Sequence, residues 1–387
     1  MAVLTVCRLT KLDRISIPRD TRIIGLGEAN HGTREFQILK HKLAKYLIQN
    51  HELNVIVFEF PFSDGLLLND YVLGLNDSGI GILTGRKNSE YNNRAFIDFI
   101  EDIRNLNSSK EESKSIQFLG SDIFGKPSAV KQLMGYLHKH DSIFVKKIKK
   151  YETLSENLYV SAFQQDKKEF KQLSRIILKR LEINKKLYLT SSSALKYSRM
   201  VRLAEILAIE WKGNRRAKEW SNNIFQILDE NPNNKIFFFG HNIHIGTFYK
   251  REVGHYIKQK YENYFTIGTD YNSGSFMAKN LKDRKNPVPG ILDVIPMKNS
   301  FADHLSAYTG DFHFLRLPTD ENESTQWLSE TNYIARIGFG FIEPFTRPEQ
   351  GREVFVLTKS IDAMIVFDSI TPTNLLNDKT LLKKRHE

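Results

Sequence analysis

The sequence predicts an α/β fold of three layers, α/β/α, in which a mainly parallel central sheet is interrupted by a large helical insertion. Short apolar runs rich in β-branched and aromatic residues end repeatedly at polar or glycine-containing turns, which is typical of buried strands in a helix-covered sheet. Amphipathic stretches separate the first of these runs. The middle of the chain has an almost continuous helical pattern instead.

The chain has 387 residues, 41% of them hydrophobic, which is enough to bury a large core. A charged fraction of 26% with interspersed aromatic residues argues against extensive disorder. We predict one elaborated domain in three parts. Residues 1–125 form the first part of the α/β core, 126–229 the helical insertion and 230–387 the second part of the core.

Strand and helix patterns alternate at the start of the chain. The segment Arg34–Asn50 places Phe36, Leu39 and Leu43 on one stripe and predicts a helix between the first two strands. That spacing implies a parallel strand pair with a right-handed crossover. A second helix is expected at about Asn92–Leu106, before the third strand. The best strand candidates are Arg22–Leu26, Asn54–Phe60, Ser115–Gly120, Lys235–Gly240, Tyr264–Gly268 and Ala363–Phe367.

The segment from about Lys126 to Asp229 forms the predicted insertion. Leu and Ile recur there at spacings of three and four residues, for example in Asp166–Tyr188 and Ala194–Trp211. Such a block, inserted between two strands, could form a lid or a substrate wall beside a site at the strand ends. The alternative is a set of helices that only cover the sheet.

The chain carries 56 Lys and Arg against 45 Asp and Glu, a formal net charge of +11, with an isoelectric point near 9.4. A basic balance suggests an anionic partner. However, basic runs such as Lys146–Lys150 have acidic residues near them, which is typical of a solvated helix face. We therefore expect no nucleic-acid partner. The basic C-terminal segment Leu382–Glu387 is expected to be a frayed tail.

Cellular location is inferred from cysteine content and hydropathy. The single cysteine, Cys7, excludes an intrachain disulfide and fits a reducing compartment. Charges interrupt Met1–Arg14 early, so no signal peptide is predicted, and no apolar run approaches the roughly 20 residues of a membrane helix. We expect a cytoplasmic protein without a membrane partner; the sequence does not indicate an oligomeric state.

The turn after the first strand carries the most informative residues. Glu28 and His31 lie there, where ligands bind in open parallel sheets, outside the carboxyl ends of the strands. Gly27 and Gly32 would allow the backbone to bend tightly and approach a substrate. Thr33 is the expected N-cap of the following helix.

Three further strand ends carry polar residues. Glu59 lies within an apolar run, so it requires a partner, for which a histidine of the neighbouring strand's turn is the natural candidate. His241 and His244 follow the fourth strand, and two histidines there favour a site over a structural role. Asp122 follows the third strand, where it serves either the site or a helix cap. The alternative for Glu59 is a structural carboxylate held by backbone donors.

These residue types permit two chemistries. A neutral imidazole can take a proton from water while a carboxylate orients the ring. Clustered His and Glu can also hold a divalent metal that activates water. A His-Glu-x-x-His motif, a Gly-x-Ser-x-Gly elbow, a phosphate-binding loop and a dinucleotide fingerprint are all absent from the sequence, which disfavours the enzyme classes they mark.

The segment Gly27–Phe36 closely resembles the Gly-Glu-Ala-x-His-Gly-Thr signature of the erythromycin esterase family. Val57-Phe58-Glu59, Gly120-Ser121-Asp122 and His241-Asn242-Ile243-His244 resemble later motifs of the same family, in the same order. The similarity extends from about residue 20 to 370, because segments near Ile267–Phe276 and Ile361–Phe367 also match.

Members of that family hydrolyse the macrolactone ester of 14-membered macrolide antibiotics, so the resemblance implies a macrolide or lactone as the small-molecule substrate. It also implies that His31 is the general base that activates water, with Glu28 and Glu59 orienting and tuning the histidines. His241 and His244 would stabilise the oxyanion or protonate the leaving alkoxide. No metal or other cofactor is expected.

Other positions are expected to bind substrate or support the site. The basic position of the family's first helix corresponds to Lys40 or Lys42. The segment Arg215–Asn222 departs from the family pattern because an acidic residue is missing although the asparagine remains, which bears on the identity of the substrate. The supporting residues are Arg34, Lys40, Asp122 and Asn242.

Two other functions stay open at this point. One is an esterase of the same fold that acts on another lactone or ester in secondary or polysaccharide metabolism. The other is a metal- or haem-binding protein that uses the same histidines without turnover.

Overall fold

The computed structural model describes residues 4–7, 15–85, 89–111, 114–157, 164–209, 215–282, 288–306, 312–318, 326–341 and 346–376. The predicted tail at Leu382–Glu387 and most of Met1–Arg14 lie outside these residues. The chain divides into two compact units. Unit 1 comprises Met1–Glu59, Leu68–Phe118 and Asn233–Glu387, and unit 2 comprises Phe60–Leu67 and Leu119–Pro232.

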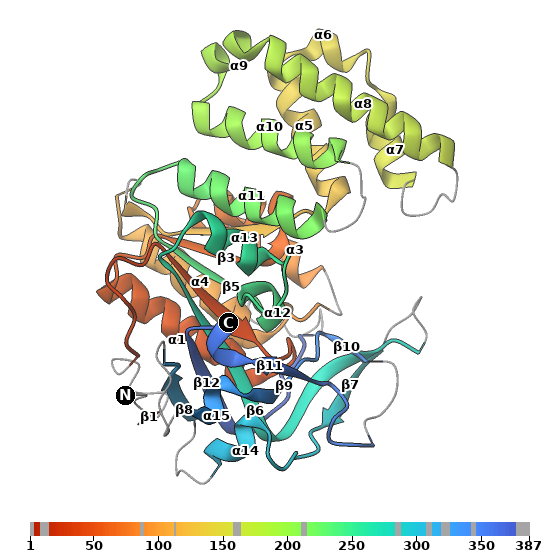
Figure 1. Cartoon of the computed structure of the whole chain (residues 1–387). Helices are drawn as coiled ribbons and strands as arrows, with labels where there is room; N and C mark the ends of the chain where they lie inside the picture. The colour runs from red at the N-terminus through yellow and green to blue at the C-terminus, as the bar shows by residue number, and fades with distance from the viewer. Residues whose placement is uncertain are drawn as a thin grey trace, which may run out of the picture. The chain divides into compact units, whose positions relative to one another are not determined.

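A central sheet of ten strands, counted over the described residues, has the main order β1-β8-β12-β6-β2-β5-β3-β4 (Figure 1). The strands β12, β6, β2, β5 and β3 run parallel to one another, whereas β8 is antiparallel to both β12 and β1. The predicted α/β class with a mainly parallel sheet is confirmed. Strand bounds are β1 (Leu4–Cys7), β2 (Ile23–Glu28), β3 (Val55–Pro61), β4 (Gln117–Asp122), β5 (Ile236–His241), β6 (Tyr264–Asn280), β8 (Phe312–Arg316) and β12 (Ala363–Ile370).

All six predicted strands are present, and the two predicted helices are α1 (Arg34–Asn50) and α4 (Arg94–Ser108). One detail differs from the prediction. The strands β2 and β3 are parallel but not adjacent, because β5 pairs with both of them. The sequence places β5 almost two hundred residues after β3, so the local pattern of strand, helix and strand cannot reveal this insertion.

The shorter elements outside the helical region complete this part of the chain. Two of the strands, β7 and β10, extend the sheet from β6, and β9 pairs with β11 in a separate two-stranded sheet. Their bounds are α2 (Phe62–Val72), α3 (Gly81–Thr84), α12 (Asn242–Ile245), α13 (Val253–Lys260), β7 (Val288–Asp293), α14 (Phe301–Leu305), α15 (Gln326–Ser329), β9 (Thr331–Ala335), β10 (Gly340–Phe341), β11 (Arg352–Val356) and η3 (Leu357–Lys359).

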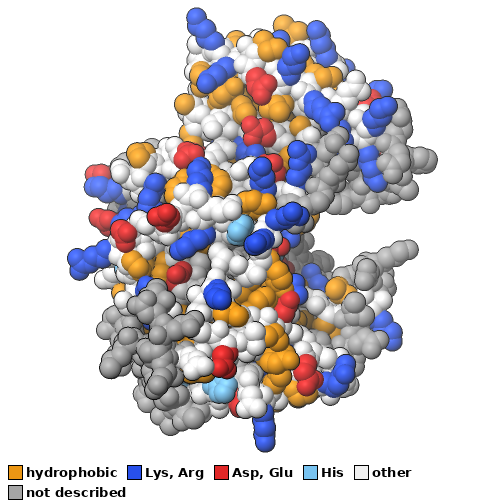
Figure 2. Space-filling view, viewed as in Figure 1, with side chains coloured by type: hydrophobic (Ala, Val, Ile, Leu, Met, Phe, Trp, Pro, Cys, Tyr) orange, Lys and Arg blue, Asp and Glu red, His pale blue; other side chains and the backbone are white. Residues whose placement is uncertain are grey.

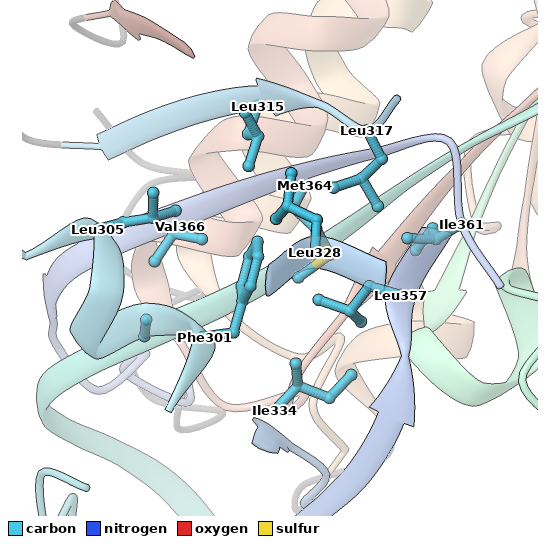
Figure 3. Close-up of a cluster of buried hydrophobic side chains, with 11 residues drawn as sticks. Phe301, Leu305, Leu315, Leu317, Leu328, Ile334, Leu357, Ile361, Met364 and Val366 are labelled. Atoms are coloured by element: carbon cyan, nitrogen blue, oxygen red, sulfur yellow. The ribbon is translucent and has the colours of Figure 1, made fainter. Parts of the chain in front are cut away.

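Both faces of the unit 1 sheet are covered, as alternate residues of β12 show. Met364 and Val366 lie in a buried cluster with Phe301 of α14 and Leu328 of α15 (Figure 3). The next residue, Phe367, packs instead against Phe36 of α1, with ring centroids 5.5 Å apart. Because successive side chains of a strand point to opposite faces, α1 lies on one face and α14 and α15 lie on the other. This arrangement is the predicted three-layer core.

Unit 2 is mainly helical and has its own core. Tyr151 stacks on Phe170, with centroids 4.8 Å apart, and Tyr188 packs between Tyr136 and Tyr197. The predicted helical character of residues 126–229 is thus confirmed where they are described, while a role as lid or substrate wall stays a prediction. The helices are α5 (Lys126–His140), α6 (Ser142–Val145), α7 (Lys150–Asn157), α8 (Gln164–Ile183), α9 (Lys185–Ser191), α10 (Ala194–Ala208) and α11 (Arg215–Asp229).

The described residues show how charges are distributed on one face of the protein and whether any helix could cross a membrane. Lys and Arg side chains are spread over the face shown in Figure 2, with acidic side chains among them. Every helix that is described is too short or too polar to cross a lipid bilayer.

Candidate active site

The turn from β2 into α1 is held tightly against β6. Gly32 accepts a hydrogen bond from the Met277 backbone N–H (3.0 Å), and a Cβ at Gly32 would lie only 1.6 Å from the Met277 carbonyl oxygen. Within the turn, Asn30 Oδ1 accepts from the Gly32 N–H (3.0 Å) and the Thr33 hydroxyl (2.9 Å). Thr33 is the N-cap residue as predicted, but its hydroxyl bonds to Asn30 and not to the helix. The turn can therefore form only with glycine at position 32.

Glu28 ends β2 as a fully buried carboxylate. The Lys40 ammonium group of α1 contacts its Oε1 and also donates to Gln37 Oε1 (3.1 Å). Burial lowers the pKa of Lys40, although the charge of Glu28 opposes that shift. Lys42 is exposed, so Lys40 is the basic residue of α1 that meets the site. The other Glu28 oxygen, Oε2, lies 3.6 Å from His31 Nδ1.

Glu59 of β3 lies among three histidines, so its carboxylate has histidine neighbours, as its place in an apolar run requires. Its Oε2 accepts from the His241 backbone N–H (2.9 Å) and lies 3.8 Å from His31 Nε2. Its Oε1 lies 3.5 Å from His244 Nε2. A Cβ at Gly240 would come within 2.9 Å of this carboxylate, so the glycine leaves room for it. Because β5 separates β2 from β3, the carboxylate reaches histidines of two different strand ends.

The five predicted catalytic residues thus come together in unit 1, and we name Glu28, His31, Glu59, His241 and His244 the histidine–carboxylate cluster. The rings of His31 and His241 have centroids 5.5 Å apart, and those of His241 and His244 are 6.3 Å apart. These side chains come from the end of β2 and the turn after it, from β3, from the end of β5 and from α12. Their assembly at the carboxyl edge of a parallel sheet agrees with the general position of ligand sites in such sheets.

The two nearest histidines differ in charge. Burial disfavours a charged His31, but the hydrogen bond to Glu28 and the charges of Glu59 and Glu28 outweigh it and raise the pKa of His31 to about 9. Burial lowers the pKa of His241 to about 3, and the charges of His31 and His244 add to that shift. At neutral pH the resting site therefore holds an imidazolium at His31 and a neutral ring at His241.

Asn242 fixes the position of the two later histidines. Its amide donates to the Thr269 carbonyl (2.8 Å) and accepts from the Thr269 N–H (3.1 Å) on β6. The Thr269 hydroxyl also accepts from the Ala29 N–H (3.0 Å) in the first turn. Asn242 and Thr269 therefore tie the turn after β5 and the turn after β2 to the same strand.

A supporting role for Arg34 and Asp122 stays a prediction, because their described contacts lie elsewhere. Arg34 opens α1 with an exposed side chain, and among the described residues no contact ties that side chain to the cluster. Asp122 belongs to unit 2, where it forms an ion pair with Arg216 (2.6 Å). It does not cap α5, because the N-cap residue there is Gly125.

Glu252 is a member of the site that the sequence analysis missed. It precedes α13, and its Oε2 lies 2.9 Å from His244 Nδ1, opposite the side of the ring that faces Glu59. Its segment, Lys250-Arg251-Glu252, has the composition of an ordinary solvated turn. The only sequence signal was its distance of eight residues from His244.

Metal binding was the other chemistry that the residue types permitted. Among the described residues, no three His, Cys, Asp or Glu side chains are arranged so that they could hold a metal ion. In the cluster each imidazole faces a carboxylate or another ring, which suits the positioning of protons.

A family model described as erythromycin esterase matches residues 48–370, most of the chain. The chain belongs to the erythromycin esterase family. The matched range includes Glu59, His241 and His244 but begins after the turn with Glu28 and His31. In that turn, the resemblance of this family member to the family signature therefore depends on the residues Gly27–Phe36 and not on the match to the family model.

A curated relative, erythromycin esterase type II from Escherichia coli, is 33% identical to this family member over 105 residues. That alignment covers 27% of the chain and 24% of the relative, so the chain matches about a quarter of the relative's length.

Solved structures share the fold at low sequence identity. A Bacillus cereus protein has a TM-score of 0.79 at 20% identity, covering 96% of this chain and 94% of that one. A succinoglycan biosynthesis protein has a TM-score of 0.75 at 18% identity, with 92% and 90% covered. A mutant of the erythromycin esterase EreC in its open conformation has a TM-score of 0.69 at 14% identity, with 97% and 100% covered.

Proposed function

We propose that this member of the family is a carboxylic ester hydrolase that opens the macrolactone ester of 14-membered macrolides with a water molecule activated by His31. The observation that carries the proposal is the position of His31 between two carboxylates, with Glu28 beside Nδ1 (3.6 Å) and Glu59 beside Nε2 (3.8 Å). A ring held on both sides can take a proton from water without losing its orientation.

In the proposed reaction, neutral His31 accepts a proton from water as the hydroxide attacks the ester carbonyl carbon. Neutral His241 donates a hydrogen bond to the resulting oxyanion, since its lowered pKa keeps it uncharged and Ile243 N–H occupies its Nδ1 (3.4 Å). His244, oriented by Glu252, gives a proton to the alkoxide as the ester C–O bond breaks. The product is a single ring-opened hydroxy acid, and transfer of a proton from His31 to His244 through solvent restores both rings. A preorganised donor to an oxyanion contributes roughly a hundredfold or more in rate.

The test is incubation of the purified protein with erythromycin, followed by mass spectrometry for a product heavier by one water. We expect His31→Ala to lower kcat by about a hundredfold to ten-thousandfold, because a general base contributes that much. The matched control is His304→Ala, which removes an exposed histidine of α14 outside the cluster. Hydrolysis that survives in His31→Ala would overturn the role of His31.

A second candidate is an esterase that acts on another lactone or on an acylated saccharide. One reason to consider this second function is the structural similarity to a succinoglycan biosynthesis protein over 92% of this chain. The other reason is that the segment Arg215–Asn222 departs from the family pattern. A panel of macrolides, simple lactones and acylated saccharides, assayed with and without chelator, separates the two. Loss of activity with chelator would indicate metal-assisted chemistry, and a visible absorption spectrum would detect haem.

A further inference from the structure

Unit 2 contains a cavity that the proposed ester hydrolysis does not use. It has a volume of about 500 Å³, and its lining residues come mainly from the C-terminal part of α5 and the junction of α9 with α10. That volume is within the roughly 300–1,000 Å³ of small-molecule sites. All of its lining residues are described and all belong to unit 2. The cavity is therefore a property of this unit alone.

The charge of the lining is entirely basic. Lys139 and His140 come from α5 and Lys196 from α10, and none of the described lining residues is acidic. The two ammonium groups belong to different helices, so an anion between them could interact with both. Charge-assisted hydrogen bonds to phosphate oxygens are stronger than neutral ones. The lining thus favours a ligand with more than one negative charge.

Neutral hydrogen-bonding groups surround these charges. Ser191, Ser192 and Ser193 form the wall at the α9–α10 junction, and Gln132 contributes an amide from α5. Ser191 is bonded to His140 Nδ1 (2.8 Å) and Ser193 caps α10 by accepting from the Lys196 N–H (3.1 Å), so both are held in place. Hydroxyl and amide groups of this kind suit the hydroxyls of a sugar.

Tyr136 provides a buried polar atom in the lining. The residue is 6% exposed, and among the described residues its hydroxyl has no hydrogen-bond partner of acceptable geometry. The nearby Ser192 hydroxyl only partly opposes the rise in the pKa of Tyr136 that burial causes. A buried hydroxyl without a partner is unfavourable, which makes this atom a candidate hydrogen-bonding group for a ligand of the cavity.

Gly135 keeps one side of the cavity open. It is exposed in the interior of α5, and a Cβ there would meet no atom within 4 Å. Glycine in a helix interior stabilises the helix less than alanine does. No packing contact requires glycine at this position, so a side chain there would extend into open space beside the lining.

We infer that this cavity, formed by α5 and the α9–α10 junction, binds a small phosphorylated sugar. The phosphate lies between Lys139 and Lys196, and the sugar hydroxyls contact Gln132 and the serine wall. This inference is independent of ester hydrolysis, since all of its residues lie outside the histidine–carboxylate cluster.

The test is isothermal titration calorimetry of the full chain with ribose 5-phosphate at constant ionic strength, with ribose for comparison. We expect saturable binding of ribose 5-phosphate with a Kd below ~1 mM. Inorganic phosphate should compete, and ribose should show no comparable binding. The double variant Lys139→Gln/Lys196→Gln should bind about tenfold or more weakly, because two charged donors are lost.

The matched control is Lys185→Gln/Lys186→Gln, which removes two exposed lysines of α9 that do not line the cavity. Gly135→Glu adds a negative charge to the lining at a position where a Cβ meets no atom within 4 Å, and it should abolish binding. Circular dichroism checks that each variant is folded. The inference is overturned if the native chain shows no saturable binding, if ribose binds equally, or if the control weakens binding as much as the double variant.

Discussion

His31 and His241 show how strongly one neighbouring side chain decides the state of a histidine. Their rings are 5.5 Å apart and both are buried, yet the pKa of one is raised and that of the other lowered. Carboxylates lie beside both nitrogens of His31. Glu59 accepts a hydrogen bond from the His241 backbone N–H, and its charge raises the pKa of the His241 ring by less than burial lowers it. The proton therefore resides on His31 in the resting site.

The first consequence is a pH-dependent rate. A general base must be neutral, so kcat/KM of the native chain is expected to rise with pH through about 9. Glu28→Gln removes the charge beside Nδ1, lowers the pKa of His31 and shifts this rise toward lower pH. A pH–rate profile from pH 6 to 10 measures the shift. The matched control is Glu262→Gln at an exposed position, and an unchanged profile in Glu28→Gln would contradict the assignment.

The second consequence is a pH-dependent stability. His31 has a higher pKa folded than its ordinary value of 6.5, so its charge stabilises the fold fully below about pH 6.5. That stabilisation is lost as pH rises through about 9. The difference in unfolding free energy between the native chain and His31→Gln should therefore shrink from pH 6 to pH 9.5. Urea unfolding measures this difference, and a constant value over that range would exclude the raised pKa.

At the scale of elements, the contact between the β2–α1 turn and β6 controls the site. Gly32→Ala would place a Cβ 1.6 Å from the Met277 carbonyl oxygen, so the turn must move. We expect a loss of about 2 kcal/mol or more in unfolding free energy, as overpacking produces, together with reduced kcat because Glu28 and His31 shift. The control is Gly290→Ala in β7, where a Cβ meets no atom within 4 Å. Equal losses in both variants would contradict this contact.

Elements with a strong local pattern could be predicted from the sequence. The helix α1 was predicted with the bounds that the structure shows, because its apolar stripe is continuous from Phe36 to Leu47. The strand β6 was predicted only to Gly268, yet it continues to Asn280. The stretch Asn272–Ser275 within it is half-buried and lacks apolar side chains, so hydropathy alone does not identify the strand as continuous.

Contacts between distant segments could not be predicted in the same way. The approach of His244 to Glu59 follows from the insertion of β5 between β2 and β3, which depends on pairing across the whole sheet. The antiparallel strand β8 and the edge strand β1 are short, and they lacked a distinctive pattern. The residues of the cluster could be named because each follows a strong strand. Glu252 follows none, and only the fold brings it to His244.

At the scale of the whole molecule, two units have separate aromatic cores. In unit 1, Phe58 packs against Phe96, Phe118 and Phe239 at centroid distances of 5.3 to 5.6 Å. In unit 2, Tyr151 stacks on Phe170, and its hydroxyl bonds to Ser174 (2.7 Å). Two cores of this kind can open separately, since local stability follows local burial.

Tyr151→Ala tests this independence. The change removes a fully buried ring of α7 and should destabilise unit 2 by about 3–5 kcal/mol, the usual cost of truncating a buried aromatic side chain. Hydrogen exchange measured by mass spectrometry should then show faster exchange in α5, α7, α8 and α10, with β2, β5 and β12 unchanged. The reciprocal variant Phe96→Ala should accelerate exchange in unit 1 strands first. Faster exchange in both units with Tyr151→Ala alone would show that they unfold as one, because a single cooperative core transmits the loss of any buried ring to every strand.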